Sequence, residues 1–330
     1  MSSSPPAVEL LLWSDLLGPP TAATITVIER AFSYDGLGLL VVRGIPGFVE
    51  ARAAALPFSH SFATLPEAVK QKYIHEPSFY SFGWSHGKEK FSGQPDFAKG
   101  SYYFNPIHDT PTSVPPASLP PTLLPFLHPN IWPTAEDCPG FEPAAKQLAG
   151  LMVSAGAELA RHVDAYVAQH HAALSSTPIP PSQSLERIVR ASCTHKARLL
   201  YYFPAASQGQ PASEAEAAAA AAGAPPPSPW CGAHNDHGSL TALTSALFFD
   251  GATGATLPGG CPDPTAGLYI KTRAGHTVRA PIPADCLAFQ IGECAQVMSG
   301  GALQATPHWV RAPAGEGCSG IARGTMAVFM

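Results

Sequence analysis

The feature that most constrains this chain is the stretch WCGAHNDHGSLT, residues 230–241, together with the apolar segment that follows it. The apolar residues at 240–249 predict a β-strand. His234 and Asp236 stand two positions apart just before this strand, and side chains at i and i+2 of an extended chain point to the same face. An imidazole nitrogen and a carboxylate oxygen can therefore converge on one metal ion without a bend in the backbone.

A second histidine would have to come from a distant segment. The pattern His-x-Val-Arg-Ala-Pro occurs twice, at 276–281 and at 308–313. His308 is the better candidate, and His276 is the alternative. Two histidines and one carboxylate on one face of a metal leave positions open, which is the ligand arrangement of non-haem Fe(II) oxygenases.

A second copy of His-x-Asp occurs at His162 and Asp164. It lies within 141–171, where apolar residues recur at helical spacing and predict a long helix. Residues two apart on a helix do not share a face. We therefore interpret this copy as structural.

The sequence HNDHGSLT at 234–241 resembles the His-x-Asp-His-Gly-x-x-Thr signature of the isopenicillin N synthase-like 2-oxoglutarate/Fe(II) dioxygenases. The resemblance extends from about residue 25 to the C-terminus and is strongest over 190–330. It implies a mainly β fold with flanking helices (α+β), in which a double-stranded β-helix, or jelly-roll barrel, encloses the iron. The implied metal ligands are His234, Asp236 and His308, with no catalytic residue beyond them.

The resemblance also implies a site for 2-oxoglutarate. Arg323 and Thr325 are similar to the family's Arg-x-Ser/Thr pair, and together with the glycine-containing turns at 292–301 they favour His308 over His276. On a strand the two residues share a face, where a guanidinium group and a hydroxyl can hold a carboxylate. The family often has Asn-x-Tyr before a proline; here Tyr201 stands at the Asn position, and we expect its hydroxyl to supply the third contact.

Composition narrows the range of partners. The net charge of −5 and the pI near 6.2 give no basic footprint for nucleic acid, so a small molecule is the expected partner. The 7 cysteines are odd in number and form no Cys-x-x-Cys pair, which argues against a disulfide framework and for a reducing, cytoplasmic location. Neither a signal peptide nor a membrane span is evident.

The 36 prolines and 29 glycines favour many turns and short strands. We predict an N-terminal, partly helical region over 1–190 and a jelly-roll core over 191–330, with an Ala/Pro-rich insertion at about 205–229. A loop at 79–90, rich in aromatic residues, is a candidate for the substrate mouth. The predicted helices are 24–32, 48–56, 65–73 and 141–171, and the predicted strands are 37–42, 196–203, 240–249, 267–272, 276–281, 286–291, 306–311 and 320–329.

The resemblance thus implies an oxidoreductase that uses Fe(II), O2 and 2-oxoglutarate, with ascorbate as a possible reductant, to hydroxylate a small metabolite with release of succinate and CO2. We expect a monomer without nucleic-acid or membrane partners. Two alternatives stay open: an Fe(II) oxidase of the same fold that does not use 2-oxoglutarate, and a non-catalytic binding protein. The family usually continues beyond the last strand into a helix, whereas this sequence ends at Met330.

Overall fold

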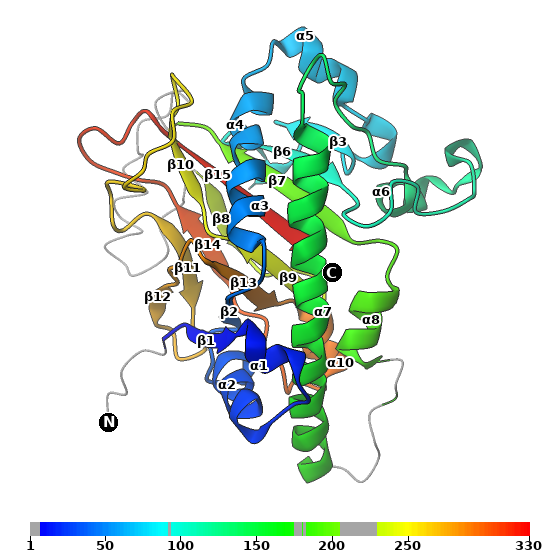
Figure 1. The fold of residues 1–330 in the computed structure, drawn as a ribbon, viewed down its shortest axis with the longest axis vertical. Coiled ribbons are helices and arrows are strands. Elements are labelled where there is room, and N and C mark those ends of the chain that lie inside the picture. The colour runs from blue at the N-terminus through cyan, green and yellow to red at the C-terminus, as the bar shows by residue number, and fades with distance from the viewer. Residues whose placement is uncertain (1–6, 92–93, 175–179, 181–182, 205–229) are drawn as a thin grey trace.

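One large mixed sheet dominates the computed structural model, which describes residues 7–91, 94–174, 180, 183–204 and 230–330 (Figure 1). The sheet has nine strands in the order β1-β2-β13-β9-β15-β7-β6-β3, with β10 paired to β15. The central strand β13 is buried on both faces. The strands are β1 (Glu9–Leu12), β2 (Leu39–Arg43), β3 (Gly83–His86), β6 (Lys99–Phe104), β7 (Lys196–Tyr202), β9 (Leu240–Thr244), β10 (Leu247–Asp250), β13 (Cys286–Ile291) and β15 (Ile321–Phe329).

A four-stranded sheet in the order β12-β11-β14-β8 faces the large sheet. A hydrophobic cluster joins the two, because it includes Val41 and Leu200 from the large sheet and Ile270 and Val310 from the small one. The faces that meet in this cluster are called the inner faces below. The small sheet consists of β8 (Cys231–His234), β11 (Gly267–Lys271), β12 (Thr277–Arg279) and β14 (His308–Arg311), and a separate hairpin pairs β4 (Lys90–Phe91) with β5 (Gln94–Pro95).

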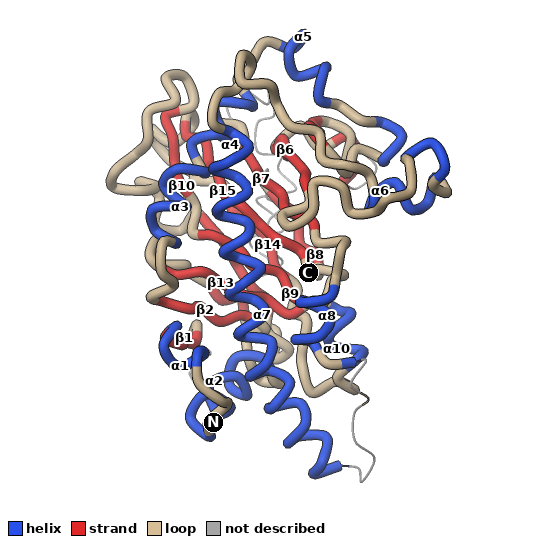
Figure 2. Tube along the Cα trace, turned by 45° about the vertical axis from the view of Figure 1, so that its right-hand side comes forward, coloured by secondary structure: helices blue, strands red, loops and turns tan. Residues whose placement is uncertain are grey.

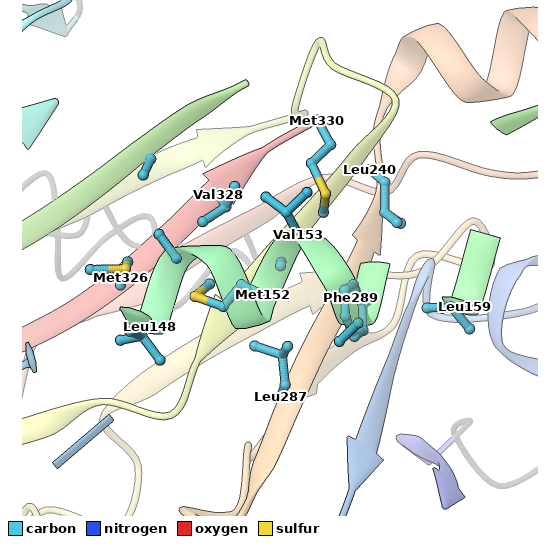
Figure 3. Close-up of a cluster of buried hydrophobic side chains, with 14 of the residues drawn as sticks. Leu148, Met152, Val153, Leu159, Leu240, Leu287, Phe289, Met326, Val328 and Met330 are labelled. Carbon is cyan, nitrogen blue, oxygen red and sulfur yellow. The ribbon is translucent and has the colours of Figure 1, made fainter. Parts of the chain in front are cut away.

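Helix α7 (Phe141–Leu174) covers the other, outer face of the large sheet, as the view in Figure 2 shows. Met152 and Val153 lie over Leu287 and Val328 of the sheet (Figure 3). Each such side chain contributes roughly 1.5–3 kcal/mol when fully buried. The other helices are α1 (Trp13–Leu17), α2 (Ala22–Phe32), α3 (Phe48–Ala55), α4 (Pro57–Ala63), α5 (Glu67–Lys70), α6 (Leu124–Leu127), α8 (Leu185–Ala191), α10 (Glu293–Met298) and the 3-10 turns η1 (Gln71–Tyr73), η2 (Glu76–Ser78), η3 (Pro116–Ser118) and η4 (Pro121–Leu123).

Most predicted elements are present, but several differ from the prediction. The strand expected at 240–249 is two strands, β9 and β10, which pair with different parts of the large sheet. The helix expected at 65–73 is only the short α5 followed by a 3-10 turn. Strands β1, β3 and β6 were not predicted, and they add residues of the first 190 to the same sheet as the later strands.

The predicted insertion at 205–229 lies outside the described residues. Within the described part of the chain, no helix combines the length and the apolar character that a membrane span requires.

Candidate metal and anion site

The two histidines expected to bind a metal lie side by side on the small sheet. His234 ends β8, His308 begins β14, and the two residues are direct partners in the antiparallel register. Their ring centroids are 4.3 Å apart. The two imidazoles therefore lie next to each other, although their residues are more than 70 positions apart in the sequence.

Asp236 completes the group from a loop. It follows the end of β8, so the shared-face argument for a strand does not explain its position. Instead, its backbone carbonyl accepts a hydrogen bond from the Glu293 amide at 2.8 Å. Its Oδ1 atom lies 3.8 Å from Nε2 of His234 and 3.9 Å from Nε2 of His308.

The close approach of the Asp236 loop to the start of α10 requires glycine at position 292. A Cβ atom on Gly292 would lie 2.0 Å from the carbonyl oxygen of Gly238 and 3.1 Å from that of Asp236. No side chain fits at such distances. The loop that carries the carboxylate is therefore fixed against the end of β13.

The hydrogen bonds of the two imidazoles leave their Nε2 atoms for a ligand. Nδ1 of His234 lies 2.9 Å from the Gly232 carbonyl oxygen, so it carries the proton. Nδ1 of His308 lies 3.2 Å from the Thr306 carbonyl oxygen and 2.7 Å from the Gln290 amide group. The structure places the amide nitrogen of Gln290 toward this Nδ1. Because the Thr306 carbonyl oxygen can only accept, a proton on Nδ1 requires the Gln290 amide to be turned over, and Nε2 of both rings is then left facing Asp236.

The burial of the group is uneven. The side chains of Asp236 and His308 are 8% exposed, whereas that of His234 is 44% exposed. All three offer ligand atoms within 4.8 Å of one another, so they could hold one metal ion. A group that is enclosed on one side and open on the other leaves room for further ligands.

The structure separates the remaining histidines with a predicted role from this group. His276 is exposed in the turn before β12. His162 is buried within α7 and contacts Thr24 and the Leu16 carbonyl oxygen, so the second His-x-Asp copy is structural as predicted. His237 points away to solvent and pairs with Glu293 at 2.8 Å.

Arg323 lies on the inner face of the large sheet. Its side chain is buried at 4% exposure, and its Nε and Nη1 atoms have no hydrogen-bond partner among the described residues. The guanidinium carbon lies 4.7 Å from the centre of the Tyr202 ring. Burying a charged group without a partner is strongly unfavourable, so this position suits an anion supplied from outside the chain.

Thr325 is also on the inner face, but its hydroxyl already has partners. It donates to the Thr244 carbonyl oxygen at 3.0 Å and lies 3.1 Å from the Thr244 hydroxyl. A contact with a bound anion would require it to give up the first of these bonds.

The structure does not bring Tyr201 to the site. Tyr201 belongs to the outer cluster under the helices, and its hydroxyl lies 3.0 Å from Nδ1 of His60. The next residue, Tyr202, points inward and is the register partner of Arg323. Neighbouring residues on a strand face opposite sides, so an offset of one position moves the hydroxyl to the wrong face.

Two residues of the site were missed by the sequence reasoning. Tyr202 could have been found from strand parity, because it shares a face with Arg198 and Leu200. Gln290 is the one amide side chain of β13, whose six residues are all buried. A buried amide side chain in an otherwise apolar strand indicates a hydrogen-bond partner, which here is His308.

Comparisons with known proteins agree with this architecture. No protein-family model matches the chain, and neither does any curated protein. Among solved structures, a full-length Neurospora crassa protein in complex with alpha-KG (2-oxoglutarate) and thymine has a TM-score of 0.64 at 18% identity, covering 100% of this chain and 87% of that chain.

Two further structures show the same likeness. A putative 2OG-Fe(II) oxygenase family protein from Caulobacter crescentus has a TM-score of 0.64 at 18% identity, covering 98% of this chain and 86% of that chain. The dioxygenase for auxin oxidation from rice has a TM-score of 0.53 at 16% identity, covering 98% and 82%. The chain therefore has the fold of the 2OG-Fe(II) oxygenases.

Proposed function

We propose that this protein is an Fe(II)- and 2-oxoglutarate-dependent dioxygenase that oxidises a small organic molecule. The observation that carries the proposal is the combination of a His-Asp-His group with a buried, unpaired guanidinium group between the same two sheets. The fold shared with 2OG-Fe(II) oxygenases supports it. We further propose that the two sheets form a double-stranded β-helix, with 191–330 as its core and 1–190 as the flanking region.

In this proposal His234, Asp236 and His308 hold Fe(II). The donor set fits, because two imidazole nitrogens and one carboxylate oxygen are the facial triad of non-haem iron sites. The carbonyl oxygens of Gly232 and Thr306 keep the imidazoles in the required tautomer and orientation. The exposed side of His234 leaves access for the remaining ligands.

Arg323 and Tyr202 would hold the distal carboxylate of 2-oxoglutarate. Arg323 provides a charge and free N–H groups, and the Tyr202 ring keeps the guanidinium in place by stacking against it. Tyr201 has no part in this arrangement. Bound Fe(II) and 2-oxoglutarate supply the oxidising chemistry with O2, and hydroxylation is the default outcome, with release of succinate and CO2.

The test is Fe(II)-dependent formation of succinate from 2-oxoglutarate without added substrate. We expect slow turnover in the unmodified protein, complete loss in Asp236→Ala, and at least a tenfold higher KM for 2-oxoglutarate in Arg323→Ala. His276→Ala is the matched control for His308→Ala, because both histidines stand in His-x-Val-Arg-Ala-Pro. Only the His308 change should abolish turnover.

Two results would contradict the proposal. Absence of Fe(II) binding would exclude the enzyme as described and favour a non-catalytic binding protein. O2 consumption with tight Fe(II) binding but without any dependence on 2-oxoglutarate would favour the oxidase of the same fold, in which Arg323 binds a carboxylate of the substrate.

A further inference from the structure

A second feature of the inner face lies outside the metal and anion site. A cavity of about 200 Å³ opens between the large sheet and the loop that precedes β3. Strands β3 and β6, which border it, lie in the upper part of Figure 1. Ser85 of β3, Tyr103 of β6 and Lys196 of β7 form its floor. All three side chains point to the inner face, as register with Ser101, Arg198 and Phe329 shows.

The cavity wall includes an unusual piece of backbone. Phe79 and Tyr80 both line the cavity and both have positive φ, 51° and 60°. Non-glycine residues rarely adopt this conformation, and two in succession store of order 1–3 kcal/mol each. Such strain concentrates at binding sites, where the surrounding structure holds it in place. Here it turns two aromatic side chains toward one space.

Lys196 is the distinctive charged group of the cavity. Its ammonium group donates to the carbonyl oxygens of Ser81 and Pro125 at 2.8 and 2.9 Å and lies 3.3 Å from the centre of the Phe82 ring. No carboxylate of the described residues pairs with it. The amine is buried and has no counter-ion among the described residues. Burial therefore lowers its pKa to about 7.

The other charges around the cavity do not supply that counter-ion. Glu89 is taken up by Arg198 at 2.7 Å and Lys99 at 3.4 Å. Although desolvation raises its pKa, these two cations lower it to about 2, so it stays ionised and neutralised. The remaining titratable groups nearby are Tyr80, Tyr103, His128 and the exposed Lys88, and none of them is an acid of ordinary strength.

The cavity and the metal group are connected by one row of inner-face residues. Gln290, which contacts His308, is the register partner of Thr241. Thr241 pairs with Phe329, and Phe329 pairs with Lys196. Three strand spacings of ~4.8 Å separate the ends of this row, about 14 Å. The Lys196 ammonium group extends away from this row, toward the Ser81 and Pro125 carbonyl oxygens beside β3 and α6, so the cavity lies beyond the end of the row that is far from the metal group.

We propose that this cavity binds a small aromatic or apolar organic acid, whose carboxylate pairs with Lys196. One buried ammonium group balances one negative charge, which favours a monocarboxylate over a phosphate dianion. Phe79 and Tyr80 provide apolar surface for the body of such a molecule. The inference goes beyond the proposed function, because it assigns a binding site of its own to this cavity.

The test uses acids and their neutral counterparts. Benzoate, phenylacetate and 3-phenylpropionate are titrated calorimetrically, each beside its primary amide, into protein saturated with Mn(II) and 2-oxoglutarate, which bind without turnover. We expect at least one acid to bind tenfold or more tightly than its amide. Lys196→Met should remove that preference, and Lys196→Arg should retain it. Lys72→Met, which changes an exposed lysine paired with Asp137, is the control and should behave like the unmodified protein.

The outcomes separate the two proposals. If Mn(II) and 2-oxoglutarate fail to bind the unmodified protein, the proposed function fails, and the acid–amide comparison on the metal-free protein still decides whether the pocket binds carboxylates. If they bind but acids and amides bind equally or not at all, the inference about Lys196 is overturned. It is also overturned if the preference for an acid survives in a folded Lys196→Met protein.

Discussion

At the scale of a single residue, the buried amine of Lys196 leads to a prediction about the pH dependence of stability. Burial lowers its pKa from 10.5 to about 7. Between these values the unfolded chain holds a proton that the folded chain has released, so the free energy of unfolding rises with pH over this interval. Below pH 7 both states are protonated, and the folded protein carries the full cost of the buried charge.

We therefore expect Lys196→Met to stabilise the protein at pH 6, by about 2 kcal/mol after allowance for the lost hydrogen bonds. The advantage over the unmodified protein should shrink as the pH rises from 7 to 10. Urea unfolding at pH 6, 8 and 10 measures it, with Lys72→Met as the exposed control. A difference that does not change with pH would show that the amine is well solvated.

Site residues were predicted correctly where the chemistry allows few residue types. They were missed where the choice depends on which face of a strand a side chain occupies. His234, Asp236 and His308 were predicted as metal ligands because few residue types bind iron, and the structure brings these three side chains together. Tyr201 was predicted by likeness to the family's Asn-x-Tyr pattern, and Tyr202, which shares a strand face with Arg198 and Leu200, was not considered. A shift of one residue on a strand reverses the face.

At the scale of elements, we predict that the connection from β13 to α10 determines the position of Asp236. Gly292→Ala should push the loop of Asp236 away, because its Cβ would lie 2.0 Å from the Gly238 carbonyl oxygen. The carboxylate would then leave the position facing both imidazoles. We expect the affinity for Mn(II) to fall at least tenfold, together with a loss of stability of 1–3 kcal/mol (on the order of other overpacked sites).

Calorimetric titration with Mn(II) measures the first effect and thermal unfolding the second. Gly18→Ala is the matched control, because a Cβ at Gly18 meets nothing within 4 Å and its φ is −86°. Unchanged metal affinity in a folded Gly292→Ala protein would show that the loop position does not determine the site.

Elements with a strong local pattern were predicted well. Helix α7 was expected at 141–171 and occupies Phe141–Leu174, because its apolar residues recur at helical spacing. Strands β3 and β6 were missed because their pairing is long-range: β3 pairs with β6, and β6 pairs with β7 almost 100 residues later. The break between β9 and β10 was missed for a related reason, since only the partner strands distinguish one long strand from two.

At the scale of the whole molecule, the His-Asp-His group joins residues from three parts of the chain, in addition to the backbone hydrogen bonds that already hold these parts together. His234 and Asp236 flank the connection from the small sheet to the large one, and His308 comes from β14. A ligand that binds the folded state alone stabilises it by RT ln(1 + [L]/Kd), which is about 2.7 kcal/mol at a hundredfold excess over Kd. Metal binding should therefore stabilise the entire fold.

We expect saturating Mn(II) to raise the Tm by roughly 2–6 °C, and 2-oxoglutarate to raise it further once the metal is bound. Asp236→Ala should abolish both increments. Arg323→Ala should abolish only the second, because the Arg323 guanidinium group has unpaired N–H groups that can bind an anion and does not contact the metal ligands. Asp164→Asn, in the other His-x-Asp copy, should lower the baseline Tm because Asp164 accepts hydrogen bonds from the start of α8. It should leave both increments intact. An increment from 2-oxoglutarate that persists in Arg323→Ala would place the anion elsewhere in the molecule, and the unpaired charge on β15 would then need another explanation.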